Sequence, residues 1–352
     1  MSSHPPHSIP AALLHALTRV AAGQVLSEDE GRSAFKAIVA GDAPPAAIGE
    51  LLLALRARGE ADSELAGAVA ALREAMLAVA YHTPSRLVDT CGTGGGSVRT
   101  INVSTAAAFV AAGAGVPIAK HGNRSFTSRS GSADVLEALG VAIHLAAERA
   151  TQILEEVGLV FLFAPDFHPA MRHLAGVRRE LGVPTLMNLA GPLANPAMAG
   201  RQVVGVANLA HAATMAGSLR RLETTHALVV HGEIGIDEVA PLGPTRVWEV
   251  RDGTVSEWRL DPADLGLGTD NLDGLEVGEP SENAARIRAL FARPAAAPAA
   301  LRAAVLLNAA AAIYVGGTGA SMPDAVSQAQ HALDSGAALA KLDALVEAST
   351  AG

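Results

Sequence analysis

Glycine residues crowd a segment that reads as a strand, a loop and the start of a helix. Residues 89–105 read DTCGTGGGSVRTINVST, and the loop holds Gly92, Gly94, Gly95 and Gly96. Glycine lets a backbone turn sharply and bring its N–H groups against an anion. The helix expected to begin at about Ser104 adds unpaired N–H donors and a positive dipole end. We therefore predict a phosphate loop after a strand that ends at Asp89.

The alternative is an ordinary glycine-rich connection that leads into an ordinary helix cap. The spacing fits neither the GxxxxGKS/T phosphate loop nor the GxGxxG dinucleotide fingerprint in its usual setting. The predicted loop is therefore a phosphate loop of another kind, in which Ser104 and Thr105 offer hydroxyls for capping, for phosphate or for a metal ion.

A second polar stretch, residues 120–134, follows the next strand-like run. Its cations and hydroxyls are Lys120, Arg124, Arg129, Ser125, Thr127, Ser128, Ser130 and Ser132. In a chain of net charge −9 this local excess favours a site for a multiply charged anion. A solvated basic loop is the alternative, and His121 alone would more often be a structural histidine.

Two further sets of charged residues complete the candidate chemistry. Asp237 and Glu238 come just beyond a predicted strand, and Mg²⁺ usually takes one or two carboxylates together with substrate phosphates. Adjacent acids are usually just exposed, so the two phosphate-type loops strengthen this metal prediction. Arg178 lies on a predicted helix and could pair with a substrate carboxylate, or with Glu180 or another acid at the surface.

The elements that position these residues fall into two kinds. The first 83 residues predict helices only, because apolar residues recur at helical spacing. Ser27 and Glu30 form a capping-box pattern, and we expect Ser63 to cap a later helix. After residue 84, short apolar runs alternate with Ala-rich helical stretches, which is typical of a mostly parallel sheet with helices on both faces. The expected strands cover residues 86–89, 116–120, 159–164, 203–207 and 227–231.

A predicted β-hairpin and a returning helical segment complete the organisation. Residues 246–250 and 254–258 flank Asp252-Gly253, a hairpin turn signal, and could form an antiparallel edge. Part of the segment from about 168 to 198 is expected to pack back on the helical domain. We therefore predict a small helical domain over residues 1–83, with that segment packed on it. Residues 84–352 would form the large α/β domain, which carries the predicted phosphate loop.

The composition excludes several classes of protein. One cysteine in 352 residues excludes a disulfide framework and a Cys-based zinc site. The net acidity argues against a protein that coats nucleic acid. The start, MSSHPPHSIP, lacks a signal pattern, and the nearest long apolar run, residues 103–119, is mostly Ala and Gly. We therefore expect a cytoplasmic protein that binds no nucleic acid and no membrane.

In their order and spacing, these segments resemble the anthranilate phosphoribosyltransferase family over nearly the whole chain, roughly from Leu14 to Leu339. The matching segments are residues 89–105, 120–139, 168–171, 177–182, 188–196 and 237–238. The resemblance implies a small N-terminal helical domain plus a larger α/β domain with a mostly parallel central sheet, of the nucleoside phosphorylase/phosphoribosyltransferase type. It also implies a homodimer formed through the helical domain.

The family transfers the phosphoribosyl group of phosphoribosyl pyrophosphate to the amine of anthranilate, with Mg²⁺, on the way to tryptophan. Carried over, the residues that bind phosphoribosyl pyrophosphate would be Gly92, Gly95, Gly96, Thr100, Asn102, Val103, Ser104, Thr105, Lys120, His121, Gly122, Asn123, Arg124, Ser125, Phe126, Thr127, Ser128 and Ser132. Those that bind anthranilate would be Gly92, Asn123 and Arg178, and those that bind Mg²⁺ would be Ser104, Asp237 and Glu238.

No side chain is predicted to act as nucleophile or as general acid or base. The amine of anthranilate is itself the nucleophile, and Cys91 has no apparent partner base. Gly96 stands where many members of the family have Asp, which removes one polar contact near the pyrophosphate or the metal. The alternatives are an enzyme like pyrimidine-nucleoside phosphorylase, which uses free phosphate, and a nucleic-acid-binding relative with a basic groove.

Overall fold

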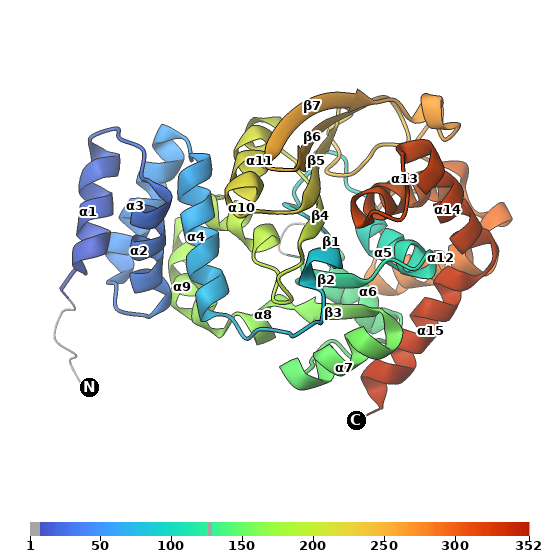
Figure 1. The fold of residues 1–352 in the computed structure, drawn as a ribbon, viewed down its shortest axis with the longest axis horizontal. Coiled ribbons are helices and arrows are strands. Elements are labelled where there is room, and N and C mark those ends of the chain that lie inside the picture. Colours follow the sequence, from blue (N-terminus) through green and yellow to red (C-terminus); the bar gives the residue numbers. More distant parts are fainter. Residues whose placement is uncertain (1–7, 126–128, 352) are drawn as a thin grey trace.

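The computed structural model describes residues 8–125 and 129–351. Three predicted binding residues, Phe126, Thr127 and Ser128, lie outside the described residues. The chain forms a helical domain at one end and an α/β domain at the other (Figure 1).

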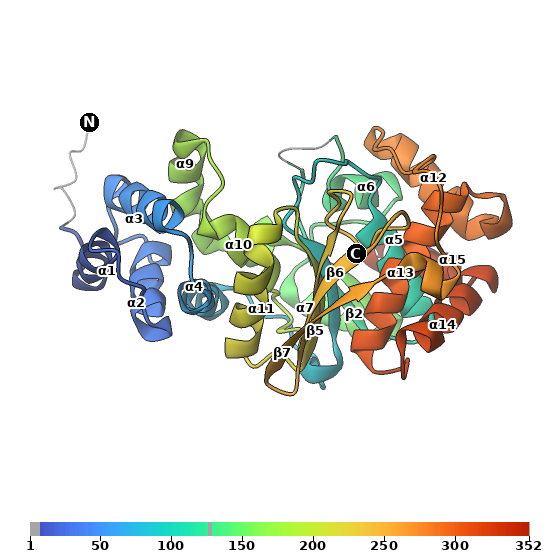
Figure 2. The same cartoon turned by 90° about the horizontal axis from the view of Figure 1, so that it is seen from above.

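Four N-terminal helices build the helical domain: α1 (Ala11–Ala21), α2 (Glu28–Val39), α3 (Pro45–Arg58) and α4 (Asp62–Ala75). The capping box predicted at Ser27 and Glu30 is present at the start of α2. Two later helices, α9 (Arg172–Leu181) and α10 (Leu186–Leu193), share the apolar core of α1–α4 through residues such as Leu174 and Leu189. Figure 2 shows α10 between α4 and the sheet.

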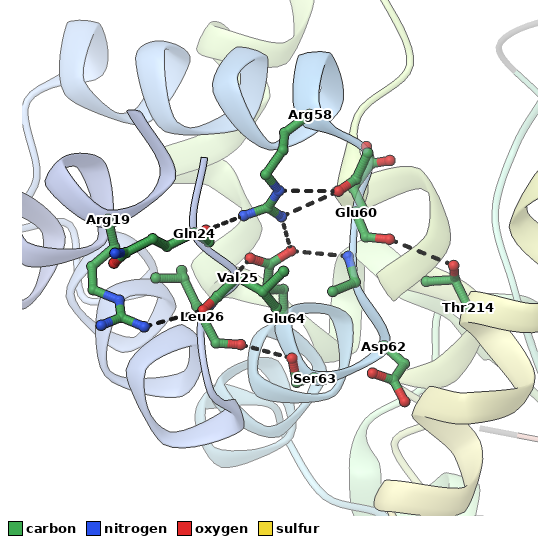
Figure 3. A network of polar contacts seen from close by, with 12 residues as sticks. Arg19, Gln24, Val25, Leu26, Arg58, Glu60, Asp62, Ser63, Glu64 and Thr214 are labelled. Atoms are coloured by element: carbon green, nitrogen blue, oxygen red, sulfur yellow. Dashed lines mark hydrogen bonds and ion pairs between the residues drawn. The ribbon is translucent and has the colours of Figure 1, made fainter. Parts of the chain in front are cut away.

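The prediction that Ser63 caps a helix is wrong. Helix α4 begins at Asp62, so Ser63 lies inside its first turn. The buried carboxylate of Glu64 takes the capping role and accepts from the backbone N–H of Ala61 at 2.9 Å. Glu64 also accepts from the N–H of Leu26 at 2.9 Å and forms an ion pair with Arg58 (Figure 3). The Ser63 hydroxyl instead donates to the carbonyl of Leu26 at 2.7 Å. This network joins the α1–α2 loop to the start of α4.

In the described part of the α/β domain, one sheet of seven strands has the order β3-β2-β1-β4-β5-β6-β7. The strands are β1 (Val88–Gly92), β2 (Ile118–Gly122), β3 (Leu159–Phe163), β4 (Arg201–Gly205), β5 (His226–Gly232), β6 (Thr245–Arg251) and β7 (Thr254–Leu260). The first five are parallel, and β6 and β7 add an antiparallel edge. The predicted hairpin turn is confirmed, with positive φ at Asp252 (51°) and Gly253 (73°).

Two strands run further than predicted. Parallel pairing of β1 with β4 continues to Gly92, opposite Gly205, and pairing of β2 with β3 continues to Gly122, opposite Phe163. The predictions that the first strand ends at Asp89 and the second at Lys120 are therefore wrong by two or three residues. Glycine has no side chain to pack and is unfavourable within strands, so nothing in the sequence indicated that β1 and β2 continue to Gly92 and Gly122.

The two faces of the sheet belong to two different apolar cores. Successive residues of a strand point to opposite faces. Leu228 and Val230 of β5 join the core of the α/β domain, whereas Ala227 and Val229 join the core of the helical domain. Helix α11 (Ala212–Arg221) covers that second face beside α4. The sheet and the helical domain are thus joined by continuous apolar packing.

The remaining helices cover the other face and the edges of the sheet. They are α5 (Val103–Gly113), α6 (Ser132–Ala138), α7 (Ala147–Val157), α8 (Ala164–Phe167), α12 (Pro280–Ala292), α13 (Ala299–Gly316), α14 (Met322–Asp334) and α15 (Ala337–Thr350). Helix α13 has 18 residues and is apolar enough to cross a membrane by length and composition, so the expectation that residues 103–119 are the nearest candidate is wrong. Because α13 packs against α5 and α14, 78% of it is buried inside the fold.

Candidate active site

A cleft of about 680 Å³ opens where the carboxyl ends of the parallel strands face α9 and α10. Ligands of open α/β sheets bind at this edge, because the loops after parallel strands converge there. Most predicted binding residues line the cleft: Gly92, Gly95, Gly96, Thr100, Asn102, Ser104, Thr105, Lys120, His121, Gly122, Asn123, Arg124, Ser125, Ser132, Arg178, Asp237 and Glu238. Val103 does not, because its side chain is fully buried in the core of the α/β domain.

The glycine loop and the acidic segment hold each other in place. The N–H of Gly94 donates to the Asp237 carboxylate at 3.0 Å. The carbonyl of Gly235 accepts from the N–H of Val98 at 3.3 Å and from the Ser97 hydroxyl at 3.2 Å. Gly94 has a positive φ of 67°, which favours glycine there. These bonds place the glycine loop directly beside two carboxylates.

The first turn of α5 lines the cleft, and no N-cap side chain bonds its backbone N–H groups. Asn102 occupies the N-cap position, but its side chain bonds Ser130 at 3.1 Å and makes no cap. The N–H of Ser104 donates to Glu238 at 3.2 Å. The Thr105 hydroxyl is buried and has no hydrogen-bond partner among the described residues. An orphaned hydroxyl at a helix N-terminus suits an anion.

Lys120 and the two acids form a charged set with incomplete partners. The Lys120 ammonium donates to the carbonyl of Thr90 and lies 3.4 Å from the Ser104 hydroxyl. Burial lowers the pKa of Lys120, against the attraction of Asp89. Burial, reinforced by the charge of Asp237, raises the pKa of Glu238 to about 8, and burial also raises the pKa of Asp237. A cation bound here would lower both pKa values by favouring the charged carboxylates.

Two histidines meet in the cleft at the ends of β2 and α8. The rings of His121 and His168 have centroids 5.1 Å apart, and each residue is only 6% exposed. Burial lowers the pKa of His121 to about 3 and that of His168 to about 4, so both imidazoles are neutral near pH 7. The Nε2 atoms have no partner among the described residues. No role was predicted for His168 from the sequence; its position after a predicted strand was the available signal.

Arg178 approaches the same cleft from the helical domain. It lies on the last turn of α9, and burial lowers the pKa of its guanidinium. No carboxylate within residues 8–125 and 129–351 lies within ion-pair distance of it, so the alternative of a pair with Glu180 does not hold there. Its neighbour Arg179 is exposed. A half-buried cation without a carboxylate partner suits a ligand carboxylate.

Known proteins resemble the chain over almost its full length. Residues 14–76 match the model described as "Glycosyl transferase family, helical bundle domain", and residues 84–339 match "Glycosyl transferase family, a/b domain". The anthranilate phosphoribosyltransferase of Rubrobacter xylanophilus is 50% identical over 96% of this chain and 97% of its own length. The chain belongs to the anthranilate phosphoribosyltransferase family.

Solved structures of the anthranilate phosphoribosyltransferase family share the fold. The enzyme from Thermus thermophilus superposes with a TM-score of 0.88 at 43% identity, over 96% of this chain and 99% of that one. The enzyme from Saccharomyces cerevisiae, solved in complex with PRPP and Mg, gives 0.87 at 26% identity, over 97% and 99%. The helical domain and mostly parallel sheet predicted from the sequence are confirmed by this match.

The donor set near the acids fits Mg²⁺ rather than a metal held by protein alone. The described residues contain no group of three or more His, Cys, Asp or Glu placed to hold a metal ion. Asp237 and Glu238 both line the cleft, and the N–H of Ser104 donates to Glu238, which brings Ser104 beside the acids. Mg²⁺ keeps several waters and is usually bound through one or two carboxylates plus substrate phosphates. The site would therefore hold Mg²⁺ together with its substrate.

Two predicted binding residues have internal constraints in the structure. Arg124 donates to Asp134 at 2.9 Å and to Glu137 at 3.0 Å, although it also lines the cleft. The Asp that many members of the family carry would fit tightly at Gly96, because a Cβ there would lie 3.0 Å from the carbonyl of Gly235 and 3.3 Å from Asp237. An acid at this position would need the loop to shift.

Proposed function

We propose that the chain transfers the phosphoribosyl group of phosphoribosyl pyrophosphate to the amine of anthranilate, giving N-(5-phosphoribosyl)anthranilate and pyrophosphate for tryptophan biosynthesis. One observation carries the proposal: an anion-binding set on the α/β domain and Arg178 on the helical domain face the same cleft. The named relatives and the fold agree with this reaction.

Charge stabilisation and alignment account for the chemistry. Displacement at the ribose C1 builds negative charge on the leaving pyrophosphate, so fixed donors and cations lower the barrier. The N–H groups of the glycine loop, the α5 N-terminus and Lys120 would take that charge. Bound Mg²⁺, held by Asp237, Glu238 and the Ser104 hydroxyl, would add charge neutralisation on the pyrophosphate oxygens.

The acceptor needs orientation more than a protein nucleophile. Arg178 would pair with the anthranilate carboxylate, Asn123 would also contact anthranilate, and Gly92 would lie where the two substrates meet. All three residues line the cleft. Burial raises the pKa of the Cys91 thiol well above the usual range, which disfavours the thiolate that a nucleophile needs. The neutral imidazoles of His121 and His168 offer acceptors in the cleft without placing positive charge there.

Anthranilate fluorescence tests the reaction directly. Purified protein, phosphoribosyl pyrophosphate and Mg²⁺ together should consume anthranilate, and omission of any one should abolish the loss of fluorescence. No consumption by protein shown to be folded would contradict the proposal. Replacing anthranilate with a nucleoside and free phosphate distinguishes a phosphorylase.

The role of Arg178 is tested by comparison with its neighbour. Arg178→Ala should raise the KM for anthranilate roughly tenfold or more, because a charge-assisted bidentate pair contributes more than about 1.4 kcal/mol. The KM for phosphoribosyl pyrophosphate should change far less. Arg179→Ala, at an exposed position one residue along α9, is the control. Equal losses for both substrates would contradict the assignment.

The family resemblance also implies a quaternary state and a location. We propose a cytoplasmic homodimer formed through the helical domain. Leu14 on α1 (53% exposed) and Leu53 on α3 (43% exposed) present apolar surface there, which supports this interface. Sedimentation equilibrium of the wild type and of a Leu14→Glu, Leu53→Glu variant would test it.

A further inference from the structure

The end of helix α10 is a junction between the two domains. Pro192 stands inside its last turn, where the carbonyl groups of a helix lack partners in the helix itself. Donors from outside the helix satisfy them. Arg73 of α4 donates to the carbonyl of Leu193 at 2.8 Å, and Gln202 of β4 donates to that of Pro192 at 3.0 Å.

Asn195 fixes the chain directly after this helix end. Its side chain is buried, with 1% of the residue exposed, and both its amide nitrogen and its amide oxygen are engaged. The amide nitrogen donates to the Asp89 carboxylate at 2.9 Å and to the carbonyl of Ala119 at 2.8 Å. The amide oxygen accepts from the N–H of Ala197 at 2.8 Å. One side chain therefore sets the position of this segment against β1 and β2.

Asp89 connects the same segment to the substrate loops. It is fully buried in β1, three residues before Gly92, where the glycine loop begins. Its second oxygen accepts from the N–H of His121 at 3.1 Å, at the end of β2. One carboxylate therefore joins both phosphate-binding strands to the end of α10, although neither Asp89 nor Asn195 is among the described residues that line the cleft.

We propose that Asp89 and Asn195 are positioning residues for phosphoribosyl transfer. Their pair fixes α10, and with it the face of the helical domain that carries Arg178, against the strands that carry the phosphate loops. The inference rests on the proposed function, in which Arg178 of the helical domain and the phosphate loops of the α/β domain act on substrates in one cleft. A displacement of about 1 Å between reacting groups can lower a rate roughly a hundredfold.

A purely structural role for the pair makes a different prediction. It would lower stability while leaving the folded fraction with the wild-type kcat. A positioning role lowers kcat and weakens anthranilate while leaving phosphoribosyl pyrophosphate bound, because the α/β domain alone supplies that site. The split between kcat, the KM for anthranilate and the affinity for phosphoribosyl pyrophosphate therefore separates the two.

The main test uses Asn195→Ala, which leaves the bond from His121 to Asp89 intact. We expect a decrease in kcat of about ten- to a hundredfold and a higher KM for anthranilate. Calorimetry should give an affinity for phosphoribosyl pyrophosphate with Mg²⁺ within about threefold of wild type. Asp89→Asn, tested in the same way, should also lower kcat, because it changes the acceptor of both the Asn195 amide and the His121 N–H. If Asn195→Ala does not fold, Asn195→Ser keeps one donor and carries the same measurement.

Glu249→Gln is the matched control. Like Asp89, Glu249 is a carboxylate with several donors, from His226 at 2.8 Å, Trp258 at 2.9 Å and Tyr314 at 3.0 Å, although it is only half-buried. It lies in β6, outside the cleft and away from the domain junction. Its replacement should lower the thermal midpoint and leave kcat unchanged.

Each outcome decides the inference. Wild-type kcat in Asn195→Ala, or a loss of phosphoribosyl pyrophosphate affinity as large as the loss in kcat, would overturn it. A wild type that consumes no anthranilate would overturn the proposed function and this inference together. An active wild type with unaffected Asn195→Ala and Asp89→Asn variants would overturn the inference alone.

Discussion

Two buried charged networks of this chain differ in how completely they are partnered. In the helical domain, the Glu64 carboxylate has Arg58 and two backbone N–H groups as partners (Figure 3). In the cleft, Asp237 and Glu238 lie side by side, and burial raises the pKa of both. The first network is complete without a ligand, whereas in the second burial disfavours the charged carboxylates, which a bound cation would stabilise.

The difference separates a structural network from a functional one without reference to any relative. A buried charge that has its counter-ion and hydrogen bonds stabilises one arrangement of the chain. Buried groups whose pKa values are displaced and whose partners are missing mark a site in a cleft. Glu64 should therefore matter for folding, and Glu238 for turnover.

The largest expected effect is on the stability of the helical domain. Glu64→Ala should lower the free energy of unfolding by about 3–5 kcal/mol, because it leaves the Arg58 guanidinium and two backbone donors without their acceptor. Urea unfolding measures this change, and kcat per folded molecule at 25 °C should stay at the wild-type value. Glu50→Ala, at an exposed position on α3, is the control. A loss of kcat in the folded fraction would remove the contrast between the networks.

The next prediction concerns a variant that should lose turnover and keep its stability. Glu238→Gln should lower kcat/KM at limiting Mg²⁺ roughly a hundredfold, which is typical of losing one charge-stabilising contact. Its free energy of unfolding without Mg²⁺ should be equal to the wild type or higher, because a carboxyl that burial disfavours is replaced by a neutral amide. Turnover over a Mg²⁺ titration and urea unfolding are the two measurements.

Glu233→Gln provides the comparison for that variant. Glu233 lies five residues before Glu238 and pairs with Arg259 at 2.7 Å at the protein surface. Its replacement should leave turnover unchanged. Destabilisation of Glu238→Gln with wild-type turnover would show that the acidic pair belongs with the structural networks.

Short-range patterns made the phosphate side of the cleft predictable from the sequence. The glycine loop, residues 120–125 and the acid pair are each local in the chain, and parallel strands bring their ends to one edge. Long-range partners were not predictable. Asn195 meets Asp89 across 106 residues, and no local pattern specifies that contact.

Helix phase and strand ends explain the other differences. Val103 stands between two residues that line the cleft, but the turn of α5 points its side chain into the core. The capping role expected of Ser63 fell to the Glu64 network, because Ser63 bonds the α1–α2 loop instead. In each case the residue type was informative and the direction of the side chain was set by tertiary packing.

The histidine pair extends the comparison to groups that stay neutral, and its effect per pH unit is the smallest of the three. Burial holds the pKa of His168 at about 4, below its ordinary value of 6.5. Because the native state resists a proton that the unfolded state accepts, the stabilising contribution is present above pH 6.5 and is lost as the pH falls toward 4. One such group changes the free energy of unfolding by about 1.4 kcal/mol per pH unit in that window.

His168→Phe removes that proton while keeping a buried ring of similar size. Between pH 6.5 and 4.5 the free energy of unfolding of this variant should fall less steeply than that of the wild type. The difference in slope should be about that of one titrating proton, or about 1.4 kcal/mol per pH unit. Urea unfolding across this range measures it, with His331→Asn at an exposed position of α14 as the control. Equal slopes for His168→Phe and wild type would mean that His168 gains its proton in the folded state, and the cleft would then carry positive charge at His168. That result would group His168 with the cations of the cleft and not with its neutral buried groups.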